Sequence, residues 1–301
     1  MTTVTSGFGI AVGGSGNGGT EFLSLLSPPR NDLSEYDNTK PHSNQAASVP
    51  PLFLEAMSVR EEVYGEQGVP LEAEFDEDDA RSWHWVVYAS VASTSSSPPK
   101  TMRPEGSTTK EEDTRRASAS AARVPVGTVR LIPPPHGPNK YIETATEGKI
   151  VDKHPDADPP PGEGIEAASR KKHPSEPYIK LGRLAVLAPY RKLGLARLLI
   201  NAALDYAKTN PHVIYQPPSP TTMELANLRG EAMQDAASWQ GLVMIHAQAN
   251  LKGYWEKHFR FKEELIDEKG QVEIEKEPTW IEEGIEHVGM WKRLNVDNNR
   301  L

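Results

Sequence analysis

The chain of 301 residues contains no cysteine. Disulfides, thiolate metal ligands and a cysteine nucleophile are therefore excluded. The sequence also lacks an apolar run of the roughly 20 residues needed to cross a bilayer, and no basic segment followed by an apolar one opens it. We therefore expect a cytoplasmic or nuclear protein that does not bind membranes.

Basic residues are fewer than acidic residues, 33 against 42, which gives a formal net charge of −9. A nucleic-acid partner is disfavoured, because binding to phosphates needs a basic field. An acidic protein instead tolerates cationic amines. Apolar residues are also scarce, at 37% of the chain, so part of the sequence is expected to lie outside the core.

Four stretches differ in composition from the rest of the chain. Residues 1–20 are rich in Gly, Ser and Thr, and no lysine follows at P-loop spacing, so a disordered terminus is expected. Residues 91–122, 133–177 and 212–240 are polar segments that we interpret as insertions. The rest of residues 21–301 is predicted to form a single domain.

The segments between the insertions show the periodicities of strands and helices. We expect a helix that includes 52–63 and ends at Gly65 or Gly68, then strands over 83–89, 124–132 and 181–187. A helix that follows the turn 191–196 and continues to about 208, a strand over 242–247, a helix over 252–258 and a strand over 284–293 come next. A strand or turn over 22–26 and a helix over 223–239 complete the set. This order predicts a mixed α/β sheet flanked by helices, with the strand over 83–89 paired to that over 124–132.

One stretch, residues 178–196, combines a buried strand with the start of a helix. The strand over 181–187 is followed by RKLGLA (191–196), which leads into the helix. A helix start leaves backbone N–H groups unpaired and carries the positive end of the macrodipole, so this turn should bind an anion. Gly194 and Ala196 would let a phosphate approach closely. Alternatively, these small residues only let the helix and strand pack together.

The helix after this turn is amphipathic, and Pro211 should end it. Its predicted apolar face consists of Leu195, Leu198, Leu199, Ala202 and Tyr206, and its polar face of Arg197, Asn201, Asp205 and Lys208. In the preceding strand, Arg183 is the one charge among apolar neighbours. It needs a partner if it is buried, and Asp76 or Glu66 would serve.

The turn matches, as R-x-x-G-x-A, the signature of the Gcn5-related N-acetyltransferase superfamily, which the chain therefore resembles. Further segments resemble the ElaA-like branch of that superfamily and occur in the expected order. They are VREEVYGEQGVPLEAEFDEDD (59–79), His84, AQA (247–249), Tyr254 with Trp255, and GIEHVGM (284–290). The three insertions lie outside the resemblance.

The resemblance implies a mostly antiparallel sheet in which the strands over 181–187 and 242–247 splay apart to hold acetyl-CoA. The amides of the turn would bind the pyrophosphate, and an amide near Val186 or Leu187 would polarise the thioester carbonyl. The cofactor-binding residues that the resemblance implies are Leu184, Ala185, Val186, Arg191, Lys192, Leu193, Gly194, Leu195, Ala196, Gln248 and Trp255.

The resemblance further implies that the amine attacks the thioester directly, without an acyl-enzyme, which fits the absence of cysteine. Members of the superfamily usually protonate the departing thiolate with a tyrosine. Here Trp255 occupies that position and Tyr254 is one residue away, so either Tyr254 or a water is the acid. Gln248 also stands where an asparagine is often found, and Arg260 where glycine is usual.

The proton leaving the ammonium could pass to Glu66, His287, Asp76, Asp79 or His84. Glu66 follows the first helix, where related folds place the acceptor. The alternative is that residues 72–79 form a solvated acidic loop and that both histidines are hydrogen-bonded strand residues. The histidines show no ligand spacing such as H-x-x-x-H, so no metal site is predicted.

We therefore predict an N-acetyltransferase that moves acetyl from acetyl-CoA to a primary amine. A small-molecule acceptor is favoured over a protein tail, because the acidic insertions should crowd an open groove. Two alternatives stay open: a CoA-binding regulatory module with little turnover, which the displaced tyrosine favours, and an acetyltransferase for protein lysines or N-termini. The sequence leaves the oligomeric state open, with a homodimer as one option.

Overall fold

The computed structural model describes residues 19–20, 22–92, 121–137, 139, 176–217, 219 and 239–296. The expected disordered terminus up to residue 18, most of the three expected insertions and the helix expected over 223–239, except Trp239, lie outside the described residues.

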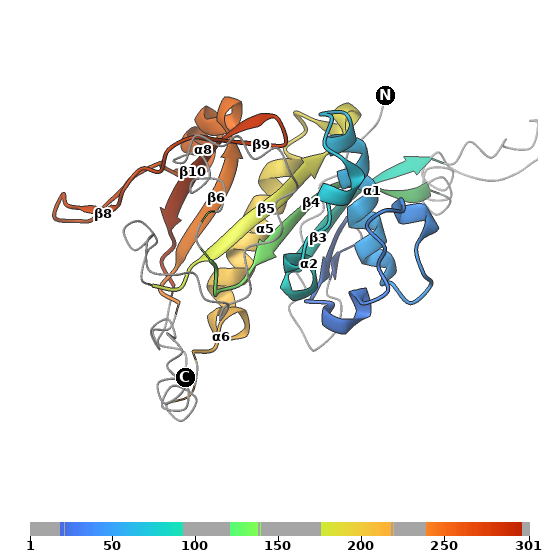
Figure 1. Ribbon diagram of the computed structural model, residues 1–301, viewed down its shortest axis with the longest axis horizontal. Helices are drawn as coiled ribbons and strands as arrows, with labels where there is room; N and C mark the ends of the chain where they lie inside the picture. Colours follow the sequence, from blue (N-terminus) through green and yellow to red (C-terminus); the bar gives the residue numbers. More distant parts are fainter. Residues whose placement is uncertain are drawn as a thin grey trace, which may run out of the picture.

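A mixed sheet of eight strands forms the centre of the described part of the chain (Figure 1). In spatial order the strands are β1 (Gly19–Thr20), β2 (Leu23–Leu26), β3 (Trp83–Ala92), β4 (Ala121–Ile132), β5 (Ile179–Val186), β6 (Leu242–Gln248), β10 (Ile285–Arg293) and β9 (Trp280–Glu282). Only β5 and β6 run parallel, and the other neighbours are antiparallel. A hairpin of β7 (Leu265–Ile266) and β8 (Val272–Ile274) extends away from this sheet.

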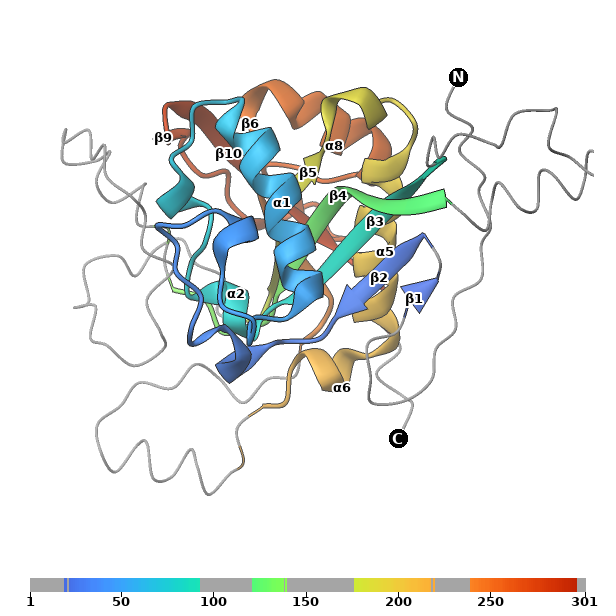
Figure 2. The ribbon, with the colours of Figure 1, turned by 90° about the vertical axis from the view of Figure 1, so that its right-hand side faces the viewer.

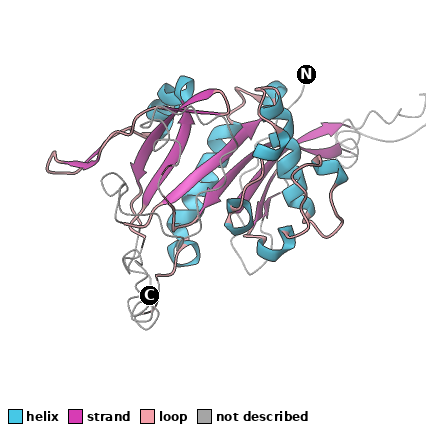
Figure 3. Ribbon diagram, viewed as in Figure 1, coloured by secondary structure: helices cyan, strands magenta, loops and turns pink. Residues whose placement is uncertain are grey.

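Helices lie on both sides of the sheet (Figure 3). They are α1 (Pro51–Gly65), α2 (Asp78–Arg81), α5 (Leu195–Thr209), α6 (Pro211–Ile214) and α8 (Lys252–Phe259), with 3-10 turns η1 (Arg30–Leu33), η2 (His42–Asn44), η3 (Leu71–Ala73), η6 (Ala188–Tyr190) and η7 (Ala249–Leu251).

Successive side chains of β3 point to opposite faces of the sheet, and they pack against α1 on one face and against α5 on the other (Figure 2). Val86 packs with Ala56 of α1, whereas Trp85 and Val87 belong to the cluster that contains Leu199 of α5. Every one of these side chains is buried. The strand is therefore apolar on both faces, because each face is covered by a helix.

The predicted order of helix, strand, strand, strand, helix, strand, helix, strand is confirmed as α1, β3, β4, β5, α5, β6, α8 and β10. The boundaries shift by a few residues. β3 and β4 pair as far as Ala92 opposite Ala121, so the insertion expected over 91–122 starts later and ends earlier than predicted. The short elements β1, β7, β8, β9, α2 and α6 were not predicted, because they have too few residues to show a period.

The buried face of α5 is broader than predicted and is rotated about the helix axis. Its fully buried residues are Leu195, Leu199, Ile200, Ala203, Leu204 and Ala207, whereas Leu198, Ala202 and Tyr206 are only partly covered. These three residues still pack against the core cluster, so the predicted face is confirmed in part, and it extends further because the helix shares this cluster with Ile214 and Trp239 as well as with the sheet. The predicted polar face is exposed.

Candidate functional site

β5 and β6 are paired along only part of their length. Ile179–Leu181 lie opposite Val243–Ile245, and no pairing follows. Beyond this point β5 stays on β4 as far as Val186, while β6 stays on β10 as far as Gln248. The two strands therefore diverge and leave a gap in the middle of the sheet (Figure 1), as predicted.

A β-bulge lies where the gap opens. Arg183 and Leu184 together oppose the single residue Val129 of β4, because the register shifts between the flanking pairs. Arg183 has a φ of 51°, in the left-handed region that non-glycine residues seldom adopt. A bulge of this kind bends the strand and redirects a side chain.

The redirected side chain of Arg183 reaches the loop that follows α1. Its Nη2 donates to the carbonyl oxygen of Ala73 at 3.1 Å and to Oδ2 of Asp76 at 2.9 Å. The prediction that Arg183 pairs with Asp76 is confirmed. This contact fastens the loop to the strand that borders the gap.

The backbone of β5 beyond the bulge also faces the gap. Leu187 donates its N–H to the carbonyl oxygen of Val126 at 3.0 Å, so this amide is already occupied. In an antiparallel pair the direction of the backbone groups alternates along the strand, so Val186 turns its N–H away from β4 and toward the gap. Of the two amides predicted to polarise a carbonyl, only that of Val186 is available.

In the turn between β5 and α5, the main chain at Gly194 is not covered by other residues. Gly194 is the N-cap residue of α5, with a φ of 84°, and no side chain caps the helix. A Cβ atom built on Gly194 would have no neighbour within 4 Å, and Lys192 also adopts a positive φ, of 66°. The first amides of α5 therefore point into open space with the helix dipole behind them, which is the geometry of an anion site.

Arg191 links this turn to two other elements. Its Nε donates to the carbonyl oxygen of Val186 at 2.9 Å, and its Nη2 lies 3.4 Å from Oε2 of Glu66. Both charged side chains are about half exposed, 47% for Arg191 and 50% for Glu66. Glu66 is thus placed beside the anion-binding turn.

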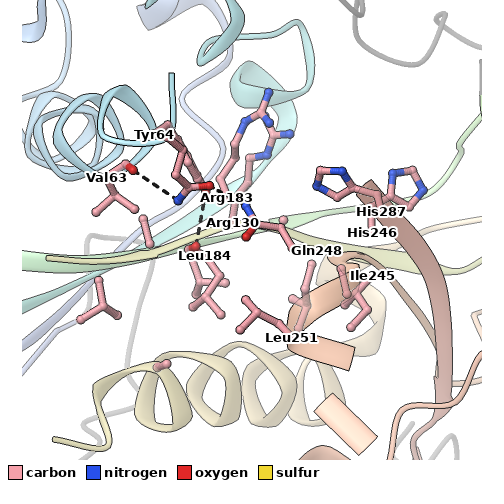
Figure 4. A pocket seen from close by; sticks show the side chains of 18 of the residues that line it. Val63, Tyr64, Arg130, Arg183, Leu184, Ile245, His246, Gln248, Leu251 and His287 are labelled. Atoms are coloured by element: carbon pink, nitrogen blue, oxygen red, sulfur yellow. Dashed lines mark hydrogen bonds between the residues drawn. The ribbon is translucent and has the colours of Figure 1, made fainter. Parts of the chain in front are cut away.

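A cavity of about 890 Å³ occupies the gap and extends from the turn to the loop after α1. Figure 4 shows Tyr64, Arg130 and Arg183 on one side of it and His246 and His287 on the other. The cavity brings together most of the predicted cofactor residues: Leu184, Ala185, Val186, Arg191, Lys192, Gly194, Leu195, Ala196, Gln248 and Trp255. Leu193, which is 50% exposed, and Glu66 do not line it.

Buried ion pairs form the wall beside the loop after α1. Asp79 accepts one hydrogen bond from Arg60 and lies 2.9 Å from Arg130, and Asp76 pairs with both Arg130 and Arg183. Burial raises the pKa of Asp79, but Arg130 and Arg60 outweigh it and hold that pKa below its usual value. The pKa of Asp76 is likewise lowered, mainly by Arg130 against burial.

His84 belongs to the same wall. Burial lowers its pKa to about 4, so the ring is neutral at physiological pH. Because Arg60 can only donate, Nδ1 of His84 accepts at 3.2 Å and Nε2 donates to the carbonyl oxygen of Asp79 at 2.9 Å. The interpretation of His84 as a hydrogen-bonded strand residue is confirmed, whereas the interpretation of residues 72–79 as a solvated loop is wrong, because Glu74, Asp78 and Asp79 are buried.

The helix α8 contributes two aromatic residues to the cavity. Trp255 is buried against Phe259 and Phe261, with ring centroids 5.5 and 5.4 Å away. Tyr254 is partly buried, and burial raises the pKa of its hydroxyl although Arg197 acts in the opposite direction. Tyr254 therefore keeps its proton at neutral pH.

The opposite wall carries His287 on β10. Its Nδ1 donates to the carbonyl oxygen of Ile285 at 2.9 Å, since a carbonyl can only accept, and this leaves the lone pair on Nε2. The ring stacks on Trp280, with centroids 6.1 Å apart. A hydrogen bond of 2.6 Å from Gln248 to Gln67 spans the gap between β6 and the loop after α1.

Glu74 is a residue of the cavity that sequence reasoning missed. It lines the cavity, is 2% exposed, and its Oε2 has no hydrogen-bond partner among the described residues. Burial, followed by the charge of Glu61, raises the pKa of its carboxyl to about 7. Nothing in the sequence separates it from Glu72 and Glu77, which are exposed.

In the part of the chain that the structure describes, no three histidine, aspartate or glutamate side chains are grouped so as to hold a metal ion. None of the described helices is long and apolar enough to cross a membrane.

Comparison with known proteins gives a family match. Residues 78–217, which include β3, β4, β5 and α5, match the model of the acetyltransferase (GNAT) family. No curated protein matched the chain.

Solved structures were also found with similar folds. One is an acyl-CoA N-acyltransferase from Pseudomonas aeruginosa, with 16% identity, a TM-score of 0.36 and coverage of 84% of this chain and 95% of that one. A second is Escherichia coli ElaA, with 14% identity, a TM-score of 0.33 and coverage of 84% and 95%. A third is Arabidopsis thaliana NAA60 in complex with a bisubstrate analogue, with 12% identity, a TM-score of 0.29 and coverage of 91% and 99%.

Proposed function

We propose that the chain is an acyl-CoA N-acyltransferase of the acetyltransferase (GNAT) family and that it transfers acetyl from acetyl-CoA to a primary amine of a small molecule. The observation that carries the proposal is the parting of β5 and β6 beside an uncapped helix start. The gap accepts an extended chain, and the helix start accepts the anion at one end of it. The resemblance of residues 59–79, 247–249 and 284–290 supports the ElaA-like branch.

The donor would lie along the edge of β5. Its pyrophosphate would sit on the amides that follow Leu193, with charge supplied by Arg191 and Lys192. The pantetheine arm would bond to backbone groups of Leu184 and Val186 like an added strand, in place of the 3.4 Å hydrogen bond that the Tyr64 hydroxyl donates to the carbonyl oxygen of Leu184. To do so it would displace the hydrogen bond between Arg191 and the carbonyl of Val186.

The chemistry would be direct attack in a ternary complex. The Val186 amide would polarise the thioester carbonyl as an oxyanion donor does. Tyr254, protonated at neutral pH and lining the cavity, would supply the proton for the thiolate. Of the predicted bases, His287 lines the cavity and offers Nε2, whereas Glu66 lies beside Arg191 at the turn before α5.

A small acceptor is favoured by the space available. Pockets for small ligands hold on the order of 300–1,000 Å³, and the cavity of about 890 Å³ must take the pantetheine arm as well as the acceptor. The Gln67–Gln248 hydrogen bond further narrows the gap on the side of α1. Little room is left for a polypeptide. An acceptor on a protein lysine or N-terminus is the alternative.

The first test of the cofactor site is Gly194→Trp. The indole would cover the helix start, so we expect acetyl-CoA affinity, measured by calorimetry, to fall about 100-fold or more. Gly270→Trp is the matched control, because Gly270 lies by the β7–β8 hairpin, has a similar φ of 78°, and an added Cβ atom there would also have no neighbour within 4 Å. Full affinity in Gly194→Trp with the control also unaffected would remove the phosphate site.

Turnover is tested by release of CoA over a panel of amines. A thiol reagent suits this assay, because the protein contributes no cysteine to the background. We expect CoA release that depends on a small primary amine. Binding of acetyl-CoA with no release for any acceptor would favour a CoA-binding regulatory module, and release only with lysine peptides or peptide N-termini would favour a protein acceptor.

A further inference from the structure

The carboxyl group of Glu74 has no role in the chemistry described so far. It lies in the cavity wall, and it is almost completely buried. Its Oε2 makes no hydrogen bond within the described part of the chain. A buried carboxyl oxygen without a hydrogen-bond donor is unfavourable, so a ligand that brings N–H groups would be stabilised there.

The position of Glu74 is fixed relative to the strand that borders the gap. Arg183 of β5 binds the carbonyl oxygen of Ala73, the preceding residue, and Arg60 of α1 lies 3.5 Å from the carbonyl oxygen of Glu74 itself. Two residues further on, Asp76 is held by Arg183 and Arg130. The loop is therefore fastened on both sides of Glu74.

The same strand carries the amide that would polarise the thioester. Val186 follows Arg183 by three positions, which corresponds to roughly 10 Å along a strand that rises about 3.3 Å per residue. Ala73, the residue before Glu74, is bonded to Arg183 of β5, and Glu74 lines the cavity that Val186 also lines. An acceptor between the two can therefore meet the carboxyl and the thioester together.

The other carboxyl groups near this wall are already paired. Asp76 and Asp79 bind arginines, and Asp78 accepts from Nε of Arg81 at 2.6 Å. Each of these carboxylates has a cation that would compete with an incoming ammonium. Glu74 forms no ion pair in the described part of the chain and remains able to accept a proton.

We propose that Glu74 is the catalytic base that takes a proton from the ammonium group of the acceptor. The inference rests on the proposed function. The ammonium gives one proton to the Glu74 carboxylate, directly or through a water, and the free amine attacks the thioester carbon. The C–N bond forms and the C–S bond breaks, so the electron pair leaves on the thiolate. A second proton passes from nitrogen to that sulfur, through Tyr254 or water, and Glu74 returns its proton to solvent.

The surroundings of Glu74 suit this role. A base works best when its pKa lies near the working pH, and burial raises the pKa of Glu74 to about 7. The charged and titratable groups that act on this carboxyl or respond to it are Glu61, Arg60, Tyr64 and Tyr36 from the α1 side and Arg183 from β5. Glu61 raises its pKa and the two arginines lower it, less strongly than burial raises it.

The test is the pH dependence of kcat/KM in wild type, Glu74→Gln and Glu72→Gln. In wild type we expect kcat/KM to rise through about pH 7 as Glu74 ionises. Glu74→Gln should lose about 100-fold and lack this limb, with the Kd for acetyl-CoA unchanged. Glu72→Gln, an exposed neighbour, should behave as wild type. A limb that persists in Glu74→Gln and vanishes in His287→Asn would assign the base to His287 and overturn the proposal.

A weakly basic amine separates catalysis from structure. If such an amine is mostly unprotonated at the assay pH, no base is needed to remove a proton before attack. Glu74→Gln should then approach the wild-type rate with this acceptor. A structural role would slow strongly and weakly basic acceptors equally, and that outcome would contradict the proposal. Glu74→Asp is a second variant and should regain part of the pH limb. If the wild-type protein releases no CoA with any amine, that result contradicts the proposed function instead.

Discussion

The two ends of the cavity are built from different parts of the chain. At the turn before α5, the main chain of residues 192–196 forms the surface, and its side chains are mostly exposed. At the loop after α1, buried side chains form the wall, with Arg60, Asp79 and Arg130 in one connected group. We therefore expect the first end to tolerate most side-chain changes except at Gly194, and the second to depend on each member of its network.

The difference follows from what each end would bind. A diphosphate is the same in every acyl-CoA, and backbone N–H groups with a helix dipole are sufficient to hold it. An acceptor amine must be positioned and deprotonated, which requires side chains of fixed orientation. We expect substitutions at the two ends to differ accordingly in their effects on stability, catalysis and binding.

The largest effect is expected for Asp79→Asn. This change leaves Arg60, which is completely buried, without its charge partner, and breaking a buried ion pair from one side costs about 3–5 kcal/mol. Unfolding in denaturant measures the loss, and the exposed Glu77→Gln is the control. A loss below about 1 kcal/mol would mean that the buried network does not hold this end together.

The next effect is the pH dependence of stability that Glu74 causes. Its pKa is raised from 4.5 to about 7 on folding, so its favourable contribution is complete below about pH 4.5 and is lost as the pH rises through about 7. Between these limits wild type should lose up to roughly 3 kcal/mol relative to Glu74→Gln. Denaturant unfolding of both proteins at pH 5 and pH 8 measures the difference, and parallel curves would refute it.

Tyr254→Phe is expected to change a free energy of similar size, but that of activation in catalysis and not that of unfolding. If Tyr254 is the acid, kcat should fall about 100-fold while the Kd for acetyl-CoA stays constant. Steady-state kinetics with calorimetry gives both quantities. An unchanged kcat would assign the proton to water and would leave Tyr254 a packing role beside His258 and Phe259.

The smallest effect is expected for Arg191→Ala at the phosphate end. This side chain is 47% exposed and its partner Glu66 is 50% exposed, so the pair adds about 1 kcal/mol or less to stability. Acetyl-CoA affinity should fall severalfold, and the fall should shrink at high salt because exposed charges are screened. A loss as large as that of Gly194→Trp would show that side chains dominate this end as well.

The turn before α5 could be predicted from the sequence because its signals are contiguous. An apolar strand, the spacing R-x-x-G-x-A and an amphipathic helix all fall within one short stretch, and each follows from local periodicity. The parting of β5 and β6 came from the resemblance and is confirmed by the register of the sheet. The positive φ of Gly194 agrees with the need for a small residue at the helix start.

The loop after α1 could be predicted only in part, because its contacts join residues that are far apart in the sequence. Arg183 and Asp76 are 107 residues apart, and their pairing was predicted only because a charge stood in an apolar strand. Glu74 and Glu72 belong to the same acidic run. Which of them is buried depends on the turn η3 and on the contacts that Arg183 and Arg60 make with the carbonyl oxygens of residues 73 and 74. The number of acidic residues in a segment does not reveal which one faces inward.

The parting of β5 and β6 also has a consequence for the lifetime of the protein. Where strands separate, their facing amides and carbonyls have no strand to pair with, and such edges are prone to join other chains. A thioester ligand lying there would act as a removable strand and would stabilise the folded state by mass action, by about 2.7 kcal/mol at 100 times its Kd. The concentration of acyl-CoA would thereby influence the rate at which the protein unfolds and aggregates.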